Sequence, residues 1–308
     1  MTYGLLAAVA WGISTLLAAV AARRIGALRT VVIGEAAGLV CYGTMFGLGH
    51  FSLRGIGGVA WLLVLAGVIG VGGYLAMYRG LESGHVGLVS AISACYGGVI
   101  AVLSVVLLRE RLTVLAVAGI IATVAGVMVA VLRMGSAPEQ PAESPAESTG
   151  ASVAASVAAS AGPAGVKAPA IGVVFGLIAA LCYGIGGFLI GRYTVNLGWL
   201  VPVVVARGGA MVLLLGLLAT PLRKPAGGHL MPGVLWALAA GVADAAGLVA
   251  FTRGDQVGLV AVTAAVSSAY PVIPLIGGLL LFRERLRRQQ VGGAMLILAG
   301  LILLGVGS

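Results

Sequence analysis

Hydrophobic residues are gathered into ten runs, each about 20 residues long, which is the length at which an apolar helix crosses a bilayer. Each run therefore predicts one membrane-spanning helix. The expected spans are Tyr3–Ala21, Thr30–Leu48, Ile56–Met77, Val86–Leu108, Thr113–Leu132, Ile171–Ile190, Leu200–Leu218, Gly233–Thr252, Gly258–Phe282 and Gln290–Val306. This pattern predicts an all-α integral membrane protein with ten transmembrane helices.

The ten runs form two copies of one five-span unit. The segment Leu108-Arg109-Glu110-Arg111-Leu112 ends the fourth run, and Phe282-Arg283-Glu284-Arg285-Leu286 ends the ninth. Charged residues make up only 9% of the chain, so a matched charged triplet indicates duplication. Because five is an odd number of crossings, the second copy enters the membrane inverted relative to the first. Inverted repeats of this kind are typical of secondary transporters.

The segment between the copies has a different composition. From Ser136 to Val166 it consists largely of Ala, Ser, Pro, Glu and Gly, and Val is its only larger apolar residue. Such a segment cannot bury enough apolar surface to fold. We therefore expect residues 134–169 to form a flexible linker between two five-helix repeats, residues 1–133 and residues 170–308.

Composition and charge support a membrane protein and exclude other classes. Hydrophobic residues are 60% of the chain and the mean hydropathy is +1.14. The net charge of +9 does not indicate nucleic-acid binding, because Lys and Arg lie at the ends of the apolar runs, where membrane proteins place them. The three cysteines and three histidines show no metal-ligand spacing, so we expect no metal ion and no cofactor. The expected partners are the lipid bilayer and a small-molecule substrate, for a monomer or homodimer.

The second copy carries motifs that resemble a known family. Ser267-Ser268-Ala269-Tyr270-Pro271-Val272 is followed by Glu284-Arg285-Leu286, and this order resembles the EamA-type branch of the drug/metabolite transporter superfamily. The resemblance covers both copies but not the linker, and the first copy departs from it with Gly97 in place of the usual Pro. It implies a ten-helix, multi-pass transporter of small organic molecules in the cell membrane.

Two charged residues occupy equivalent positions in the two copies. Glu35 lies 24 positions after Trp11, and Arg207 lies 24 positions after Tyr183. Charge inside a membrane span is costly, which makes both residues candidates for substrate binding. In one interpretation Arg207 binds a carboxylate or phosphate and Glu35 binds an amine or a proton. In the other they form a structural ion pair, or Arg207 extends to the interface.

Asp244 lies near the middle of the eighth span, and its equivalent in the first copy is Gly70. A carboxyl group in apolar surroundings favours its protonated form, so Asp244 is the candidate for proton coupling. The alternative is an Asp held by hydroxyl groups or water without a role in transport.

Four aromatic residues also occupy equivalent positions, Trp11 with Tyr183 and Tyr96 with Tyr270. They fall within spans instead of at the interface, so we expect them to line a cavity and bind an organic substrate. Interhelical packing with an internal hydrogen bond is the alternative. Pro271 removes a backbone donor and predicts a local unwinding of the ninth span, whereas Gly97 in the first copy supplies only flexibility.

These observations predict a secondary active exporter of small organic metabolites, amino-acid-like solutes or drugs, with alternating access and proton coupling. No Walker motif is present, which argues against ATP-driven transport. A non-transporting sensor or assembly protein is one alternative. A lipid-modifying membrane enzyme is another alternative. Such an enzyme would need clustered His, Asp or Glu near one interface, and the sequence shows no such cluster. We therefore expect that the protein is not an enzyme. The loop charges favour a cytoplasmic linker, whereas the resemblance implies cytoplasmic termini, and both orientations stay open.

Overall fold

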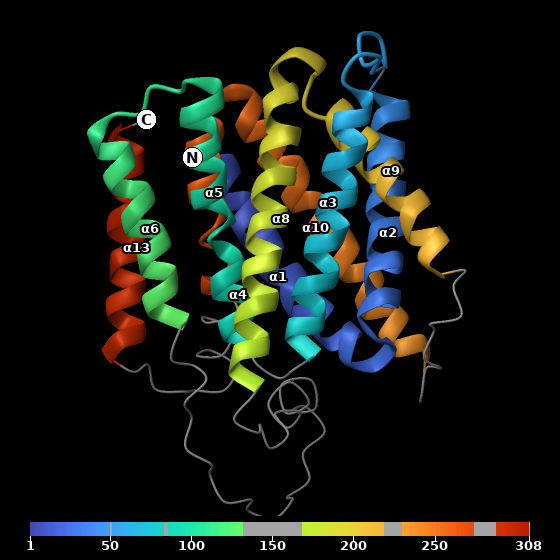
Figure 1. Cartoon of the computed structure of the whole chain (residues 1–308), viewed down its shortest axis with the longest axis horizontal. Helices are drawn as coiled ribbons and strands as arrows, with labels where there is room; N and C mark the ends of the chain where they lie inside the picture. The colour runs from blue at the N-terminus through green and yellow to red at the C-terminus, as the bar shows by residue number, and fades with distance from the viewer. Residues whose placement is uncertain (50, 83–85, 132–167, 219–229, 274–287, 308) are drawn as a thin grey trace, which may run out of the picture.

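In the computed structural model, the described residues of the spans are predominantly helical (Figure 1). It describes residues 1–49, 51–82, 86–131, 168–218, 230–273 and 288–307. Each of the ten expected spans overlaps a helix in these ranges, and the predicted all-α membrane fold is confirmed. The predicted linker, apart from its last two residues, and the second charged triplet lie outside the described residues.

The first copy begins with two helices joined by a single residue, Gly26. Its φ of 84° is a conformation that glycine adopts without strain, so the chain reverses direction there. The helices of this copy are α1 (Thr2–Ile25), α2 (Ala27–Leu48), α3 (Ala60–Glu82), α4 (Val86–Ala94), α5 (Tyr96–Leu103), the π-helical turn η1 (Ser104–Leu108) and α6 (Val114–Val131).

The second copy repeats this order. Its helices are α8 (Ala168–Leu197), α9 (Val201–Leu218), α10 (Leu230–Val257), α11 (Val260–Ser267) and α13 (Arg288–Gly307). Among the described helices, α1, α2, α3, α8 and α10 are each long and apolar enough to cross a membrane, and the other spans contain shorter apolar helices.

The two copies are inverted relative to each other, as the odd number of spans predicts. Both chain termini lie at one end of the bundle, whereas α6 ends and α8 begins at the opposite end (Figure 1). Helix packing follows the same twofold relation: α1 packs on α10 as α8 packs on α3, and α2 packs on α10 as α9 packs on α3. The first helix of each copy is therefore buried against the third helix of the other copy.

Small residues allow these helices to approach closely, which is how packing is achieved where lipid provides no hydrophobic driving force between helices. A Cβ atom at Gly241 would overlap the backbone of Gly34, and a Cβ atom at Gly67 would overlap the carbonyl group of Ala206. These two crossings, α10 on α2 and α3 on α9, are repeat equivalents. They bring the backbones of the two copies together near the middle of the bundle.

Candidate substrate-binding site

The two close helix crossings position the central charges. Glu35 directly follows Gly34 in α2, and Arg207 directly follows Ala206 in α9. Both residues are therefore fixed where the repeats meet, and both are buried, with 7% and 8% of their surface exposed. The sequence placed them at equivalent depths, and the crossings explain why their side chains reach each other.

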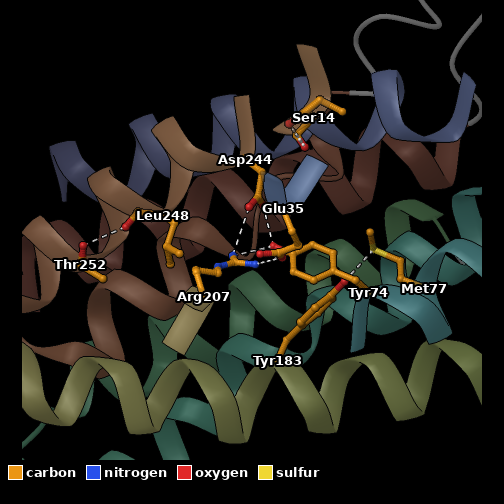
Figure 2. Close-up of polar contacts among 10 residues, drawn as sticks. Ser14, Glu35, Tyr74, Met77, Tyr183, Arg207, Asp244, Leu248 and Thr252 are labelled. Atoms are coloured by element: carbon orange, nitrogen blue, oxygen red, sulfur yellow. Dashed lines mark hydrogen bonds and ion pairs between the residues drawn. The ribbon is translucent and has the colours of Figure 1, made fainter. Parts of the chain in front are cut away.

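Arg207 is the centre of a polar network between the repeats (Figure 2). Its guanidinium forms an ion pair with Glu35, and its Nη2 lies 3.1 Å from Oδ2 of Asp244. The same Nη2 donates a hydrogen bond of 3.0 Å to the Tyr74 hydroxyl, and this hydroxyl donates one of 2.7 Å to Oδ1 of Asp244. The network joins α2, α3, α9 and α10, and it contains two carboxyl groups for one guanidinium.

A cavity lies beside this network, between the two repeats. It encloses about 850 Å³ of space, part of it open to solvent, and its described wall is largely aromatic, aliphatic and glycine residues. Arg207 and Asp244 are the charged residues of that wall, while Glu35 lines a smaller adjoining pocket with Tyr74 and Tyr78. Sites for small organic molecules have this character, namely mostly apolar walls and a few placed polar groups.

Six aromatic rings follow one another along the cavity wall. Successive ring centroids are 5.2 to 6.5 Å apart, and most pairs meet edge to face. In order the rings are Phe251, Trp11, Tyr96, Tyr183, Tyr74 and Tyr78. Aromatic faces attract organic cations and stack on planar solutes. The row of rings can therefore contact an organic solute at several depths.

The tyrosines Tyr96 and Tyr270 each bind a serine of the opposite repeat. The Tyr96 hydroxyl lies 2.7 Å from Oγ of Ser267, and the Tyr270 hydroxyl lies 2.7 Å from Oγ of Ser93. Ser93 and Ser267 are also repeat equivalents, so one contact occurs twice. Because each hydroxyl is satisfied within the protein, the ring is the part of each tyrosine that a solute can contact.

Both tyrosines lie at an interruption of a membrane span. In the second copy α11 ends at Ser267 and the chain turns through residues 268–271, so the unwinding predicted at Pro271 is confirmed. The first copy is also interrupted, at Cys95, although glycine replaces proline there. In both copies a serine lies just before the interruption: Ser93 and Ser267 each donate to a carbonyl three residues earlier, a bond that competes with the helical hydrogen bonds.

A comparison with known protein families agrees with this geometry. The sequence model of the EamA-like transporter family matches residues 1–132 and 170–306. The chain belongs to this family. It is therefore a multi-pass membrane transporter. No curated protein sequence matches this EamA-like transporter.

A solved structure shares the fold of this EamA-like transporter. It is described only as "Crystal structure of protein", and it is 19% identical to this chain. The alignment covers 99% of this chain and 96% of the other, with a TM-score of 0.62. At this level of identity the likeness shows a common fold and carries no information on substrate.

The residues predicted for binding and coupling in this EamA-like transporter come together in space. Those that line the main cavity are Trp11, Tyr96, Tyr183, Arg207, Asp244 and Tyr270, and Glu35 reaches the same network from the adjoining pocket. Glu35 and Arg207 form the ion pair of the second interpretation, yet Arg207 also lines the cavity. Asp244 has both a hydroxyl partner and a cationic partner, in Tyr74 and Arg207. Their roles in transport stay predictions.

Sequence reasoning missed two residues of the EamA-like transporter. Tyr74 joins Arg207 to Asp244, and Asp255 is a buried carboxyl group because α10 extends to Val257, beyond the expected end at Thr252. The first charged residue after the apolar run, Arg253, suggested the end of the span, but its long side chain reaches the surface and stacks on Trp199. The repeat alignment contained a signal for both residues, since their equivalents are apolar: Leu248 for Tyr74 and Leu81 for Asp255.

Proposed function

We propose that this protein is a secondary active exporter that exchanges protons for small organic solutes with an ammonium group. The two inverted repeats alternate the access of the central cavity between the two sides of the membrane. Amino-acid-like metabolites and cationic drugs are the proposed solutes, and the cell membrane is the proposed location. An inward proton gradient drives such an exchange in the direction of export.

The proposal depends on one observation, the unequal number of charges in the central network. One guanidinium, on Arg207, faces the two carboxyl groups of Glu35 and Asp244. With all three groups ionised, one negative charge is uncompensated, which is costly in the interior of a bilayer. A proton or the ammonium group of a solute can each supply the missing positive charge. Since binding of both would leave an excess positive charge, the two compete, and competition for one site is the basis of exchange.

The aromatic wall favours a cationic group, such as an ammonium group, over a neutral one. A cation over an aromatic face gains about 0.5–2 kcal/mol, with the larger values where water is excluded. The ring of Tyr74 already lies 5.1 Å from the guanidinium carbon of Arg207. The rings of Tyr96 and Tyr183 continue from this point along the cavity. A solute bound at Asp244 would therefore place its organic part against these rings.

The same geometry disfavours an acidic solute. Arg207 uses Nη1 for Glu35 and Nη2 for both Asp244 and Tyr74. A carboxylate or phosphate would compete with these two carboxyl groups for the single guanidinium, and it would add a further negative charge to a network that already has one in excess. Arg207 is in this proposal an organiser of the two carboxyl groups, and the solute's positive end is what the site recognises.

The test uses purified protein in proteoliposomes and a matched pair of probes. Phenylethylamine carries an ammonium group, and 3-phenylpropionate replaces it with a carboxylate on a similar skeleton. We expect phenylethylamine to bind with release of a proton, detected by a pH-sensitive dye, and to exchange against an imposed pH gradient. The carboxylate probe should do neither.

Two variants separate proton exchange from simple binding. Asp244→Asn removes one exchangeable carboxyl group, so the pH gradient should no longer drive phenylethylamine. Gly70→Leu fills the cavity from a position where a Cβ meets no atom within 4 Å, so binding should be lost in a folded protein. Binding of the carboxylate probe, or amine binding without proton release, would contradict the proposal. No flux for any member of a broad amine panel would favour the sensor or assembly function instead.

A further inference from the structure

Helix α10 carries a second carboxyl group on its cavity-facing stripe. Asp244, Leu248, Phe251 and Asp255 follow one another at intervals of four, three and four residues, which places them on one face of the helix. The first three line the cavity. Asp255 occupies the next position toward the end of the bundle where both termini lie. Asp255 itself does not line the cavity but is buried among packed helices just beyond it.

Asp255 is buried without a compensating partner. Its exposed fraction is 1%, and neither carboxyl oxygen has a hydrogen-bond partner among the described residues. Helix α8 closes over it at Gly191, where a Cβ atom would come within 2.7 Å of Oδ2, and Val260 of α11 packs against the same point. The described residues therefore shield this carboxyl group almost completely from solvent.

The charged groups around Asp255 do not favour its ionised form. Among the described residues, the titratable groups that interact with it are Glu110, from the connection between η1 and α6, and Tyr96 of α5. The basic neighbours on α10 and α8 are exposed and stack elsewhere, Arg253 over Trp199 and Arg192 over Tyr193. On α11, Val260 and Thr263 carry no charge. An ionised carboxylate in this position would lack a compensating charge or donor among the described residues, which is costly in a protein interior.

Glu110 has hydrogen-bond partners of its own, on the opposite repeat. Arg109 ends η1 in the left-handed conformation, with a φ of 55°, and directs Glu110 toward the other repeat. The Glu110 carboxylate there accepts hydrogen bonds from the backbone N–H groups of Val260 and Ala261, at 3.1 and 3.2 Å. It thus caps the first turn of α11, where a negative charge is favoured. The backbone N–H groups of Val260 and Ala261 therefore donate to Glu110 and not to Asp255.

We propose that Asp255 is a second proton-binding site, which is protonated while the termini side of the transporter is closed and releases its proton to water when that side opens. This inference rests on the proposed alternating access of the cavity. Opening separates α8 and α11 from α10, hydrates the carboxyl group and allows it to ionise. Closing requires it to take up a proton again. The equivalent residue in the first repeat is Leu81, which has no carboxyl group. Closing of the opposite side of the cavity therefore requires no proton uptake at this position.

Infrared spectroscopy tests the protonation directly and needs no substrate. A neutral carboxylic acid without hydrogen-bond partners has a carbonyl stretch well separated from that of a carboxylate. We expect this band in the wild-type protein and its complete loss in Asp255→Asn, with Asp255→Leu, which introduces the residue of the first repeat, as a second variant. A band that persists in both variants would overturn the proposal.

Cysteine labelling tests the link between the proton and opening. Thr194 of α8 is fully buried one turn from Gly191, so Thr194→Cys, in a background without the native cysteines, reports opening of the termini side. The labelling rate is divided by that of a cysteine at an exposed position in the same background, which removes the pH dependence of thiol ionisation itself. This ratio should rise with pH, by up to about tenfold per pH unit for one released proton, and should lose its pH dependence when Asp255→Asn is added. An equal slope in both proteins would overturn the gating role. The infrared result is independent of amine exchange, so failure at Asp244 and failure at Asp255 are distinguishable.

Discussion

Removal of the central guanidinium should destabilise the protein severely, and by an amount that the network predicts. In Arg207→Gln, Glu35 loses its ion pair, and Asp244 keeps only the 2.7 Å hydrogen bond from Tyr74. Loss of one partner from a buried ion pair costs about 3–5 kcal/mol, because the remaining charge stays buried without compensation. Here two carboxyl groups remain, so we expect a value toward the upper end of that range.

The assay is unfolding by titration with sodium dodecyl sulfate in mixed micelles, at acidic and alkaline pH. The matched control is Arg253→Gln, which removes an exposed guanidinium stacked 4.3 Å from the Trp199 ring centroid and should cost about 0.5–1 kcal/mol. The triple variant with Arg207→Gln, Glu35→Gln and Asp244→Asn contains no buried charge in the network and should recover much of the loss. If Arg207→Gln is as mild as Arg253→Gln, or if the triple variant recovers nothing, the reasoning about the network is wrong.

Further outcomes can be measured in the same unfolding assay. Gly67→Ala should cost about 1–3 kcal/mol because its Cβ overlaps the carbonyl of Ala206, whereas Gly70→Ala in open space should be neutral or slightly stabilising. Tyr96→Phe should cost about 1 kcal/mol for one lost hydrogen bond, and Tyr270→Phe should cost more, since its hydroxyl also donates to the carbonyl of Ser90. Glu110→Ala should cost about 1 kcal/mol through loss of the α11 cap; an unchanged midpoint would show that the cap contributes nothing. Arg109→Gly should stabilise the protein by about 1 kcal/mol, because a residue with a Cβ is strained at a positive φ.

The duplication made much of the central site predictable. Aligning the copies on their charged triplets exposed the positions where symmetry fails, Glu35 against Arg207 and Gly70 against Asp244. Inverted repeats bring equivalent positions together around a pseudo-twofold axis. A mismatch at such a position therefore places unlike residues near each other, which is what the ion pair between Glu35 and Arg207 shows.

Two further positions at which the copies differ also carry polar residues. Tyr74 opposite Leu248 and Asp255 opposite Leu81 are mismatches of the same kind, but a tyrosine in a membrane span and an aspartate at its end have common structural explanations. Their importance depends on neighbours from distant parts of the chain. Tyr74 bridges residues on α9 and α10, and Asp255 is enclosed by α8 and α11. The spacing of residues within α3 or within α10 does not predict contacts with these distant helices.

The amino-acid pattern alone determined the class of the protein, the number of spans, the inversion of the repeats and the charged residues of the central network, but not Tyr74, which joins two of them. These properties follow from local hydrophobicity and from internal repetition, both of which can be read along the chain. Tertiary structure alone decided which charges neutralise each other, how many remain uncompensated, and that Glu110 of one repeat caps a helix of the other. The physical reason is that charge compensation and burial depend on distances of a few ångströms between helices. Those distances are set by how closely small residues allow the helices to cross.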